Sequence, residues 1–439
     1  MDKVIYNPKF CYRKIRDSKR IIYPFLLLSF GLRLLSLPAY GAEGPSLKGF
    51  LQTNYSARIT GVKLPGAKRQ ELMLGEERGR LEGSYYPSDA RVGFDVKGEV
   101  FHDWVEDDWG AVLREGYMDY LMDKFDVRIG RQIVTWGVGD LLFINDVFPK
   151  DWEAFYLGRP LEYLKYGIDA GKLNLYTDLI SAEFIVIPHF TPDNIPSVGR
   201  FFFFDPYPNI TNREVEKPKT VFGNTEYALR MYESLAGADL SAYAYKGFYR
   251  DPAMRADNFT SPTKISLVFP ELAVYGASFQ KSALGGVVSA EYGYYDSIDD
   301  RNGKNPGIEN SQSKFLIGYQ KAFQNDLTIG LQYYGELMSQ YKEYKANLPP
   351  AFFRKKKIHQ YITLRVTKFL KYQTVKLSLF TFYSPDEEDF FITPEASINV
   401  TDNMLLALGV NIFAGVKDNT TFGQQHKNSN LYVLARCSF

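Results

Sequence analysis

The sequence predicts an all-β protein, a transmembrane antiparallel up-and-down β-barrel of about 18 strands, with 16 as the alternative count. Three observations lead to this prediction. The chain begins with the pattern of an export signal, later residues alternate apolar and polar over runs of strand length, and the connections between runs alternate between short and long. We therefore divide the chain into residues 1–41, a signal peptide that is removed, and residues 42–439, a single outer-membrane β-barrel domain.

The expected export signal has three parts in order. Basic residues come first, an apolar stretch follows at 21–37, and Ala39 and Gly41 then place small side chains two positions apart. This is the plan of a secretory signal peptide, so we predict cleavage after Gly41, with cleavage after Ala42 as the alternative. The basic residues are Arg13, Lys14, Arg16, Lys19 and Arg20.

A permanent membrane anchor is the competing interpretation of the same stretch. Pro24 and Arg33 interrupt it, and it is shorter than the ~20 residues that span a bilayer as a helix. We therefore favour cleavage and expect the chain to cross the periplasm to the cell outer membrane.

The composition fits a membrane barrel and argues against other classes. The 32 Tyr and 33 Phe are residues that favour strands and that form the aromatic girdles of such barrels. A net charge of +1 gives no electrostatic footprint for nucleic acid. Once Cys11 leaves with the leader, Cys437 is the only cysteine, and the 4 His lack ligand spacing. We expect no metal, no cofactor and no catalytic activity.

Alternating runs define the expected strands. In the clearest run, Val375, Leu377 and Leu379 share one face, and Lys376 and Ser378 share the other, as period two requires. In the first half, strands are expected at 47–60, 71–85, 90–103, 109–121, 125–136, 163–176, 179–188, 224–236 and 239–249. In the second half, they are expected at 264–280, 285–296, 313–323, 326–340, 356–368, 373–384, 389–401, 404–415 and 429–439.

The connections follow the rule of short periplasmic turns and long outer loops. A soluble sandwich has no reason to obey this rule. The short connections include Asp123-Lys124, Thr177-Asp178, Gly237-Ala238, Gln324-Asn325 and Asp402-Asn403. The long ones span about 137–162, 189–223, 250–263, 297–312, 341–355 and 416–428.

The last expected strand ends the chain on an aromatic residue. Leu431, Val433 and Phe439 share its apolar face. This ending resembles the C-terminal insertion signal of outer-membrane barrels, and the resemblance implies the barrel-assembly machinery and outer-membrane lipid as partners. We assign Phe439 as the insertion signal.

Closure of the sheet follows from the cost of unpaired backbone groups in lipid, which only helices and edge-free sheets avoid. About 18 strands leave a water-filled lumen. Charged residues on the polar faces should point into that lumen, because Arg or Lys facing lipid costs roughly 2 to 4 kcal/mol. Their mixed signs give no ion preference. The expected lumen charges are Arg78, Arg80, Lys97, Glu99, Glu183, Arg230, Glu291, Glu336, Arg365, Lys376, Glu395 and Arg436.

One segment stands out from the alternating background. Residues 127–137 read Val-Arg-Ile-Gly-Arg-Gln-Ile-Val-Thr-Trp-Gly, and residues 145–151 read Asn-Asp-Val-Phe-Pro-Lys-Asp. This pattern resembles a Gram-negative envelope family labelled domain of unknown function thirteen-oh-two. Its members carry a similar Arg-x-Gly-[Lys/Arg]-Gln-x-x-x-Trp-Gly stretch and then Asp-x-x-x-Pro-x-Asp. The resemblance implies an outer-membrane porin-like barrel for apolar or lipid-like compounds. Weaker echoes lie at 226–230, 275–279, 422–424 and 428–430.

The same segment supplies the candidates for a constriction. Arg128 and Gln132 share a polar face, Arg131 belongs to the same motif, and Trp136 is expected to end the strand at the outer rim. Asp146 and Asp151, on either side of Pro149, would fold the following loop inward, held by arginine and carboxylate. The duller alternative is that one of these two aspartates only caps a short helix or turn.

We interpret the chain as a channel that passes a small solute or apolar compound through the lumen. The main alternative is a carrier for hydrophobic, lipid or fatty-acid-like molecules that leave sideways into the membrane. A surface adhesin or assembly barrel, or an outer-membrane hydrolase, is the remaining one. The run 201–204, four phenylalanines in the longest loop, bears on this choice as a packed plug or as an apolar entry site.

Overall fold

The fold is described from a computed structural model, which covers residues 44–439 apart from 64–70, 89–90, 198, 259–260 and 350–353. The predicted signal peptide lies outside the described residues.

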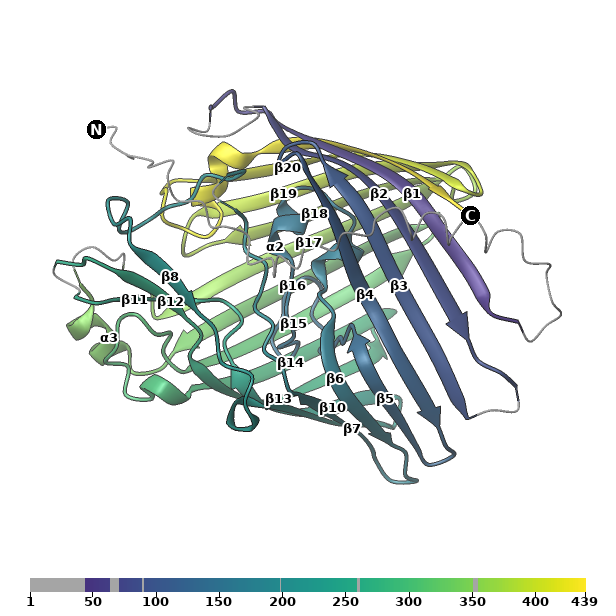
Figure 1. Cartoon of the computed structure of the whole chain (residues 1–439), viewed down its shortest axis with the longest axis horizontal. Coiled ribbons are helices and arrows are strands. Elements are labelled where there is room, and N and C mark those ends of the chain that lie inside the picture. Colours follow the sequence, from purple (N-terminus) through teal and green to yellow (C-terminus); the bar gives the residue numbers. More distant parts are fainter. Residues whose placement is uncertain (1–43, 64–70, 89–90, 198, 259–260, 350–353) are drawn as a thin grey trace.

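Eighteen strands form one antiparallel sheet that closes on itself, because β1 pairs with β2 on one side and with β21 on the other. The predicted barrel of 18 strands is confirmed. Figure 1 shows the closed wall from the side. The first nine wall strands are β1 (Ser46–Arg58), β2 (Leu72–Tyr85), β3 (Val92–Asp103), β4 (Asp108–Leu121), β5 (Phe125–Gln132), β6 (Ile168–Leu175), β7 (Ser181–Ile187), β9 (Glu226–Leu235) and β10 (Ala238–Phe248). The other nine are β13 (Glu271–Ala283), β14 (Gly286–Ser297), β15 (Gln312–Phe323), β16 (Leu327–Met338), β17 (Ile358–Leu370), β18 (Val375–Ser384), β19 (Asp389–Thr401), β20 (Met404–Gly415) and β21 (Asn430–Ser438).

The alternation in the sequence sorts side chains between the two faces of this wall. On β1, Gln52 and Asn54 are buried inside, whereas Leu51 and Tyr55 are exposed on the outside. The same division holds on β21, where Leu431 faces outward. An apolar outer face and a polar inner face follow directly from the two-residue period.

Two of the tight turns show why the wall reverses direction where it does. Ala236 and Gly237 both have positive φ, as do Leu284 and Gly285. Two successive residues with positive φ match the turn that best fits the twist of paired strands. These turns lie at one end of the barrel, called here the short-turn end.

The opposite end, the long-connection end, carries most of the remaining structure. Seven of its connections are long, but 104–107 and 385–388 have only four residues, so the strict alternation that was predicted fails there. A second, three-stranded sheet also lies at this end (Figure 1). Its strands are β8 (Arg213–Glu216), β11 (Ala253–Ala256) and β12 (Ile265–Val268). The expected strand 264–280 is thus two strands, separated at Pro270, which cannot donate to a ladder.

Short helices occupy the connections. No helix within the described ranges is long and apolar enough to cross a membrane. The α-helices are α2 (Trp152–Tyr156) and α3 (Tyr341–Asn347), and the 3-10 helices are η1 (Leu161–Leu164), η2 (Phe222–Asn224), η3 (Ile298–Asp300) and η4 (Gly423–Asn428).

Candidate functional site

The feature that shapes the lumen is the connection 133–167 between β5 and β6, called here the inner segment. It lies inside the barrel and bonds to strands on opposite sides of the wall. Its beginning contacts β14, β16 and β17, and its later part contacts β1, β2, β20 and β21. We call residues 137–147 the first arm and residues 154–165 the second arm.

Glu291 of β14 holds the first arm through backbone groups. Its carboxylate accepts hydrogen bonds from the backbone N–H of Val138, Gly139 and Asn145, at 2.8, 3.1 and 2.8 Å. The arm approaches so closely that a Cβ on Gly137, where φ is +79°, would lie 2.6 Å from Glu291 Oε1. Only glycine takes this backbone conformation at this distance without strain.

Two further side chains hold Asp140 at the centre of the first arm. Gln332 of β16 accepts from the Asp140 N–H at 2.8 Å and donates to its carbonyl oxygen at 3.0 Å. Arg365 of β17 forms a two-bond ion pair with the Asp140 carboxylate, and Arg365 Nη2 lies 2.7 Å from Oδ1. This pair is partly open to solvent, with 25% of the Arg365 side chain and 39% of the Asp140 side chain exposed.

Helix α2 leads into the second arm. Asp151 caps this helix by accepting from the Ala154 N–H at 2.8 Å, the role that the duller sequence alternative gave it. The Tyr156 carbonyl oxygen then accepts from Asn411 of β20 and Asn430 of β21, at 2.9 and 3.0 Å. The C-terminal end of the helix is therefore fixed to the wall.

Aromatic rings seal the contact between α2 and the wall. Phe155 meets Phe391 of β19 edge to face at 5.5 Å between ring centroids, and Phe391 stacks on Phe413 of β20 at 4.5 Å. Phe391 is fully buried. Offset or edge-to-face rings at these distances add to the stability gained from burial alone.

One buried ion pair and two partly exposed ones fix the end of the second arm. Arg159 donates to Glu76 of β2 at 2.6 Å, and Glu162 accepts from Arg80 of β2 and Arg436 of β21, each at 2.6 Å. Burial alone would raise the pKa of Glu162, but the two guanidinium groups outweigh it and lower that pKa below its usual range. These contacts fill the lumen beside β1 and β2.

Asp146 joins the two arms from within the segment. Its carboxylate is buried and pairs with Lys150 at 2.9 Å and with Lys165. Burial lowers the pKa of Lys165, and the neighbouring carboxylate only partly offsets this effect. The sequence hypothesis expected arginine to hold this carboxylate, whereas lysines of the segment itself do so.

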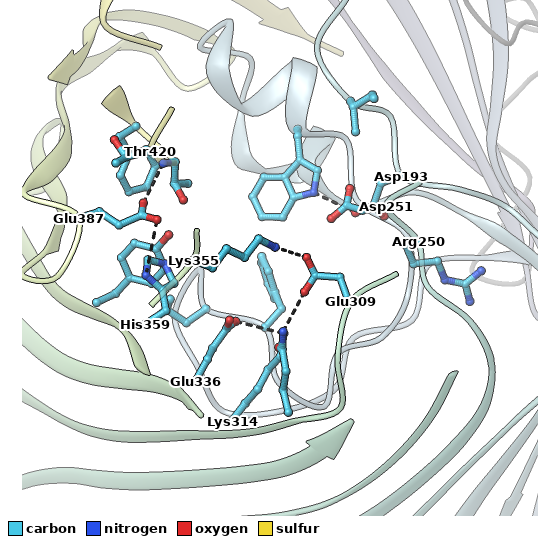
Figure 2. A pocket seen from close by; sticks show the side chains of 18 of the residues that line it. Asp193, Arg250, Asp251, Glu309, Lys314, Glu336, Lys355, His359, Glu387 and Thr420 are labelled. Atoms are coloured by element: carbon cyan, nitrogen blue, oxygen red, sulfur yellow. Dashed lines mark hydrogen bonds and ion pairs between the residues drawn. The ribbon is translucent and has the colours of Figure 1, made fainter. Parts of the chain in front are cut away.

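A large cavity of about 940 Å³ opens above the inner segment, toward the long-connection end. Figure 2 shows its charged groups: Lys355 pairs with Glu309, and Lys314 with Glu336 at 3.1 Å. Asp193 and Asp251 face the same space from the other side (Figure 2). Its apolar lining includes Trp152, Tyr361, Phe203 and Phe204. The cavity thus combines both charge signs with aromatic surface.

A small cavity of about 120 Å³ lies on the other side of the first arm. Val138 and Asp140 of the arm line it, together with Gln332 and Arg365. Among the described residues that line this cavity, only Asp140 and Arg365 carry a charge.

The strand register places the predicted lumen charges on one face. Arg78, Arg80 and Glu291 are almost fully buried inside, where the inner segment covers them. Glu395 accepts from Tyr432 Oη at 2.9 Å. The others share the inward side of their strands: Lys97, Glu99, Glu183, Arg230, Glu336, Arg365, Lys376 and Arg436.

The three polar residues of the motif divide between the two sides of β5. Arg128 and Gln132 share the inward side, where Arg128 pairs with Asp119 of β4 and Gln132 is buried. Arg131 lies on the outward side of β5 and contacts Asp169 of β6. This side follows from the alternation itself, which puts Arg131 opposite Arg128.

The predicted position of Trp136 at the outer rim is wrong. The strand ends at Gln132, so Trp136 lies in the lumen, 4% exposed, against Phe148 and Tyr243. Its indole N–H donates to Glu183. The chain leaves the wall after Gln132, four residues before Trp136, where the strand was expected to end.

The four phenylalanines of 201–204 divide between packing and the cavity. Phe201 is fully buried against Met73, Leu74 and Leu157. Phe203 and Phe204 line the large cavity. The run therefore anchors its connection and contributes apolar surface.

Several functional residues carried no signal in the sequence. Asp140, Arg159 and Glu162 belong to a connection that lacks the apolar-polar alternation of the strands. Their partners are distant in the sequence: Arg365 lies 225 residues from Asp140, Glu76 lies 83 from Arg159, and Arg436 lies 274 from Glu162. Asp140 lies between the two motif stretches and the other two follow the second stretch, and only this proximity could have drawn attention to them.

The chain matches no family model and no curated protein, so the resemblance to family thirteen-oh-two is not confirmed. Solved barrels do resemble it. OccD3 (OpdP) of Pseudomonas aeruginosa has 12% identity and a TM-score of 0.53, with 90% of this chain and 91% of that one covered. OccAB4 of Acinetobacter baumannii has 11% and 0.55, with 90% and 98% covered. OccK2 (OpdF) of Pseudomonas aeruginosa, solved in complex with glucuronate, has 10% and 0.54, with 90% and 98% covered. At these identities the likeness establishes the shared fold.

Proposed function

We propose that this protein is a channel of the Gram-negative outer membrane that passes a small solute through the barrel lumen, with the inner segment as its constriction. The observation that carries the proposal is the closed wall of 18 strands with exposed apolar side chains outside and a lumen crossed by residues 133–167. A closed wall has no unpaired edge to expose to lipid, and a wall of this size leaves room for water and solute.

The orientation follows from the two kinds of connection. The short-turn end faces the periplasm and the long-connection end faces outward, as in bacterial barrels. The large cavity then opens toward the outside and the small cavity toward the periplasm. In this reading residues 1–41 are the export leader, and Phe439, whose N–H donates to the Gly49 carbonyl at 2.9 Å, is the insertion signal.

The similar barrels support a small, polar solute. One of them was solved with glucuronate, a small organic acid. Lumen groups of both signs, such as Lys314 and Glu336, could carry the polar groups of a solute, and the aromatic lining could carry its apolar part. The solute class that we propose is thus a small molecule with at least one polar group.

The alternative of a hydrophobic carrier with a lateral exit finds less support. Each neighbouring pair of wall strands is joined by a ladder of paired residues, and the β1–β21 junction is continuous from Phe50 to Arg58. The described wall therefore offers no gap to the membrane. The apolar lining at Phe203 and Phe204 is the one observation that favours this alternative.

Conductance in planar bilayers tests the proposal. The purified full-length protein should give steady current steps in potassium chloride. Silence of correctly folded protein would contradict the channel. Silence together with lipid or detergent bound near Phe203 would support the hydrophobic carrier. Silence of a protein that still binds to whole cells would support an adhesin.

A further inference from the structure

The two cavities lie in line along the same five strands, β13–β17. On β16, Tyr334 and Glu336 line the large cavity, and Gly330 and Gln332 line the small one. On β17, the same division separates Tyr361 from Thr363 and Arg365. The first arm crosses between them at residues 138–142, with Leu141 and Leu142 facing the large cavity and Val138 and Asp140 facing the small one.

The other half of the lumen is filled. Beside β1 and β2, Arg78, Arg80 and Glu76 are at most 7% exposed and bonded to each other, to the second arm or to Glu99. A solute passing there would have to break several buried, charge-assisted bonds, which are among the strongest polar contacts in proteins. A solute passing between the first arm and the wall would have to displace a single segment of chain. Three wall side chains hold that segment: Glu291, Gln332 and Arg365.

We infer that solute passes between the first arm and strands β14–β17, and that Asp140 and Arg365 set the charge preference of this passage. The inference rests on the proposed channel function and names its route and its selectivity residues. Since they are the only charged residues that line the small cavity among those described, removing one leaves the other uncompensated in that cavity.

The pair also neutralises itself as the structure stands. The bidentate contact places the Arg365 guanidinium against the Asp140 carboxylate, so an ion in the small cavity meets little net charge. With the pair intact, the small cavity therefore favours neither sign of ion. The same balance makes each partner a sensitive position for changing the ion preference.

The test uses the full-length protein with Asp140→Asn, Arg365→Gln and the double variant in planar bilayers with a potassium chloride gradient. Asp140→Asn should raise the anion-to-cation permeability ratio, and Arg365→Gln should lower it, each by about fivefold, the effect of one unit charge a few ångströms away in water. The double variant should return the ratio to that of the wild type, because both charges are gone.

Lys97→Gln is the matched control. Lys97 also faces the lumen and pairs with Glu115 at 2.6 Å, but it lines neither cavity. It should leave the ratio unchanged. Conducting variants whose ratios equal the wild-type value, or a Lys97→Gln shift as large as the others, would overturn the inference and leave the channel function standing. A folded wild type that never conducts would overturn both.

Discussion

The two arms of the inner segment are held to the same wall by different chemistry. The second arm is fixed by buried ion pairs such as Arg159 with Glu76, and by the aromatic contact of Phe155 with Phe391. The first arm is fixed by backbone N–H groups on Glu291 and by a partly exposed ion pair at Asp140. Breaking a buried ion pair costs more than losing a solvated one. The two arms of one connection are thus held by contacts of different strength.

The largest expected effect is on the second arm. Arg159→Ala should lower the free energy of unfolding by about 3 kcal/mol, the lower end for a broken buried pair, because Arg78 still contacts Glu76. Urea unfolding of the detergent-folded barrel measures the change. Arg301→Ala, which removes an exposed pair with Asp296, is the control and should leave the unfolding midpoint in place. Equal midpoints for both variants would show that the second arm is no firmer than the surface.

A smaller loss of stability with a larger change in current is expected on the first arm. Glu291→Gln turns part of the acceptor for the N–H groups of Val138, Gly139 and Asn145 into a donor, at a cost of about 1 to 2 kcal/mol. The released arm should give larger and noisier current steps in single-channel recordings. Glu395→Gln, a change of the same kind at a lumen residue that accepts a hydrogen bond from Tyr432 and does not touch the first arm, is the matched control. Unchanged steps in Glu291→Gln would argue that the first arm does not limit the current.

The smallest expected effect is the loss of stability at acidic pH. The pKa of Glu162 is lowered in the folded protein, so its ion pairs stabilise the fold fully above the ordinary carboxyl pKa of about 4.3 and are lost as pH falls through the lowered value. Because about a third of the side chain is exposed, the contribution should be below about 1 kcal/mol. Between about pH 6 and about pH 3, the melting temperature should fall less steeply for Glu162→Gln than for the wild type. Parallel curves would mean that these pairs contribute nothing to stability.

Much of the wall could be predicted from the sequence. The two-residue alternation is a local property, so a run such as 375–384 reveals both its strand and its inward face without any knowledge of its neighbours. The same rule places Arg131 on the outward face of β5, opposite Arg128. The failures at strand ends, at Gln132 and at Pro270, arise because the last residues of a strand depend on what the following connection contacts.

The strands, their two faces and the barrel that these faces require follow from local sequence patterns, since burial of an apolar face and pairing of the backbone act on each run in turn. The path of residues 133–167 and the position of Trp136 depend instead on long-range contacts. Their contacts to Glu291, Arg365 and Glu183 join residues far apart in the chain, and no local pattern records such pairings. The shape of the lumen, and with it the route of a solute, belongs to this second class.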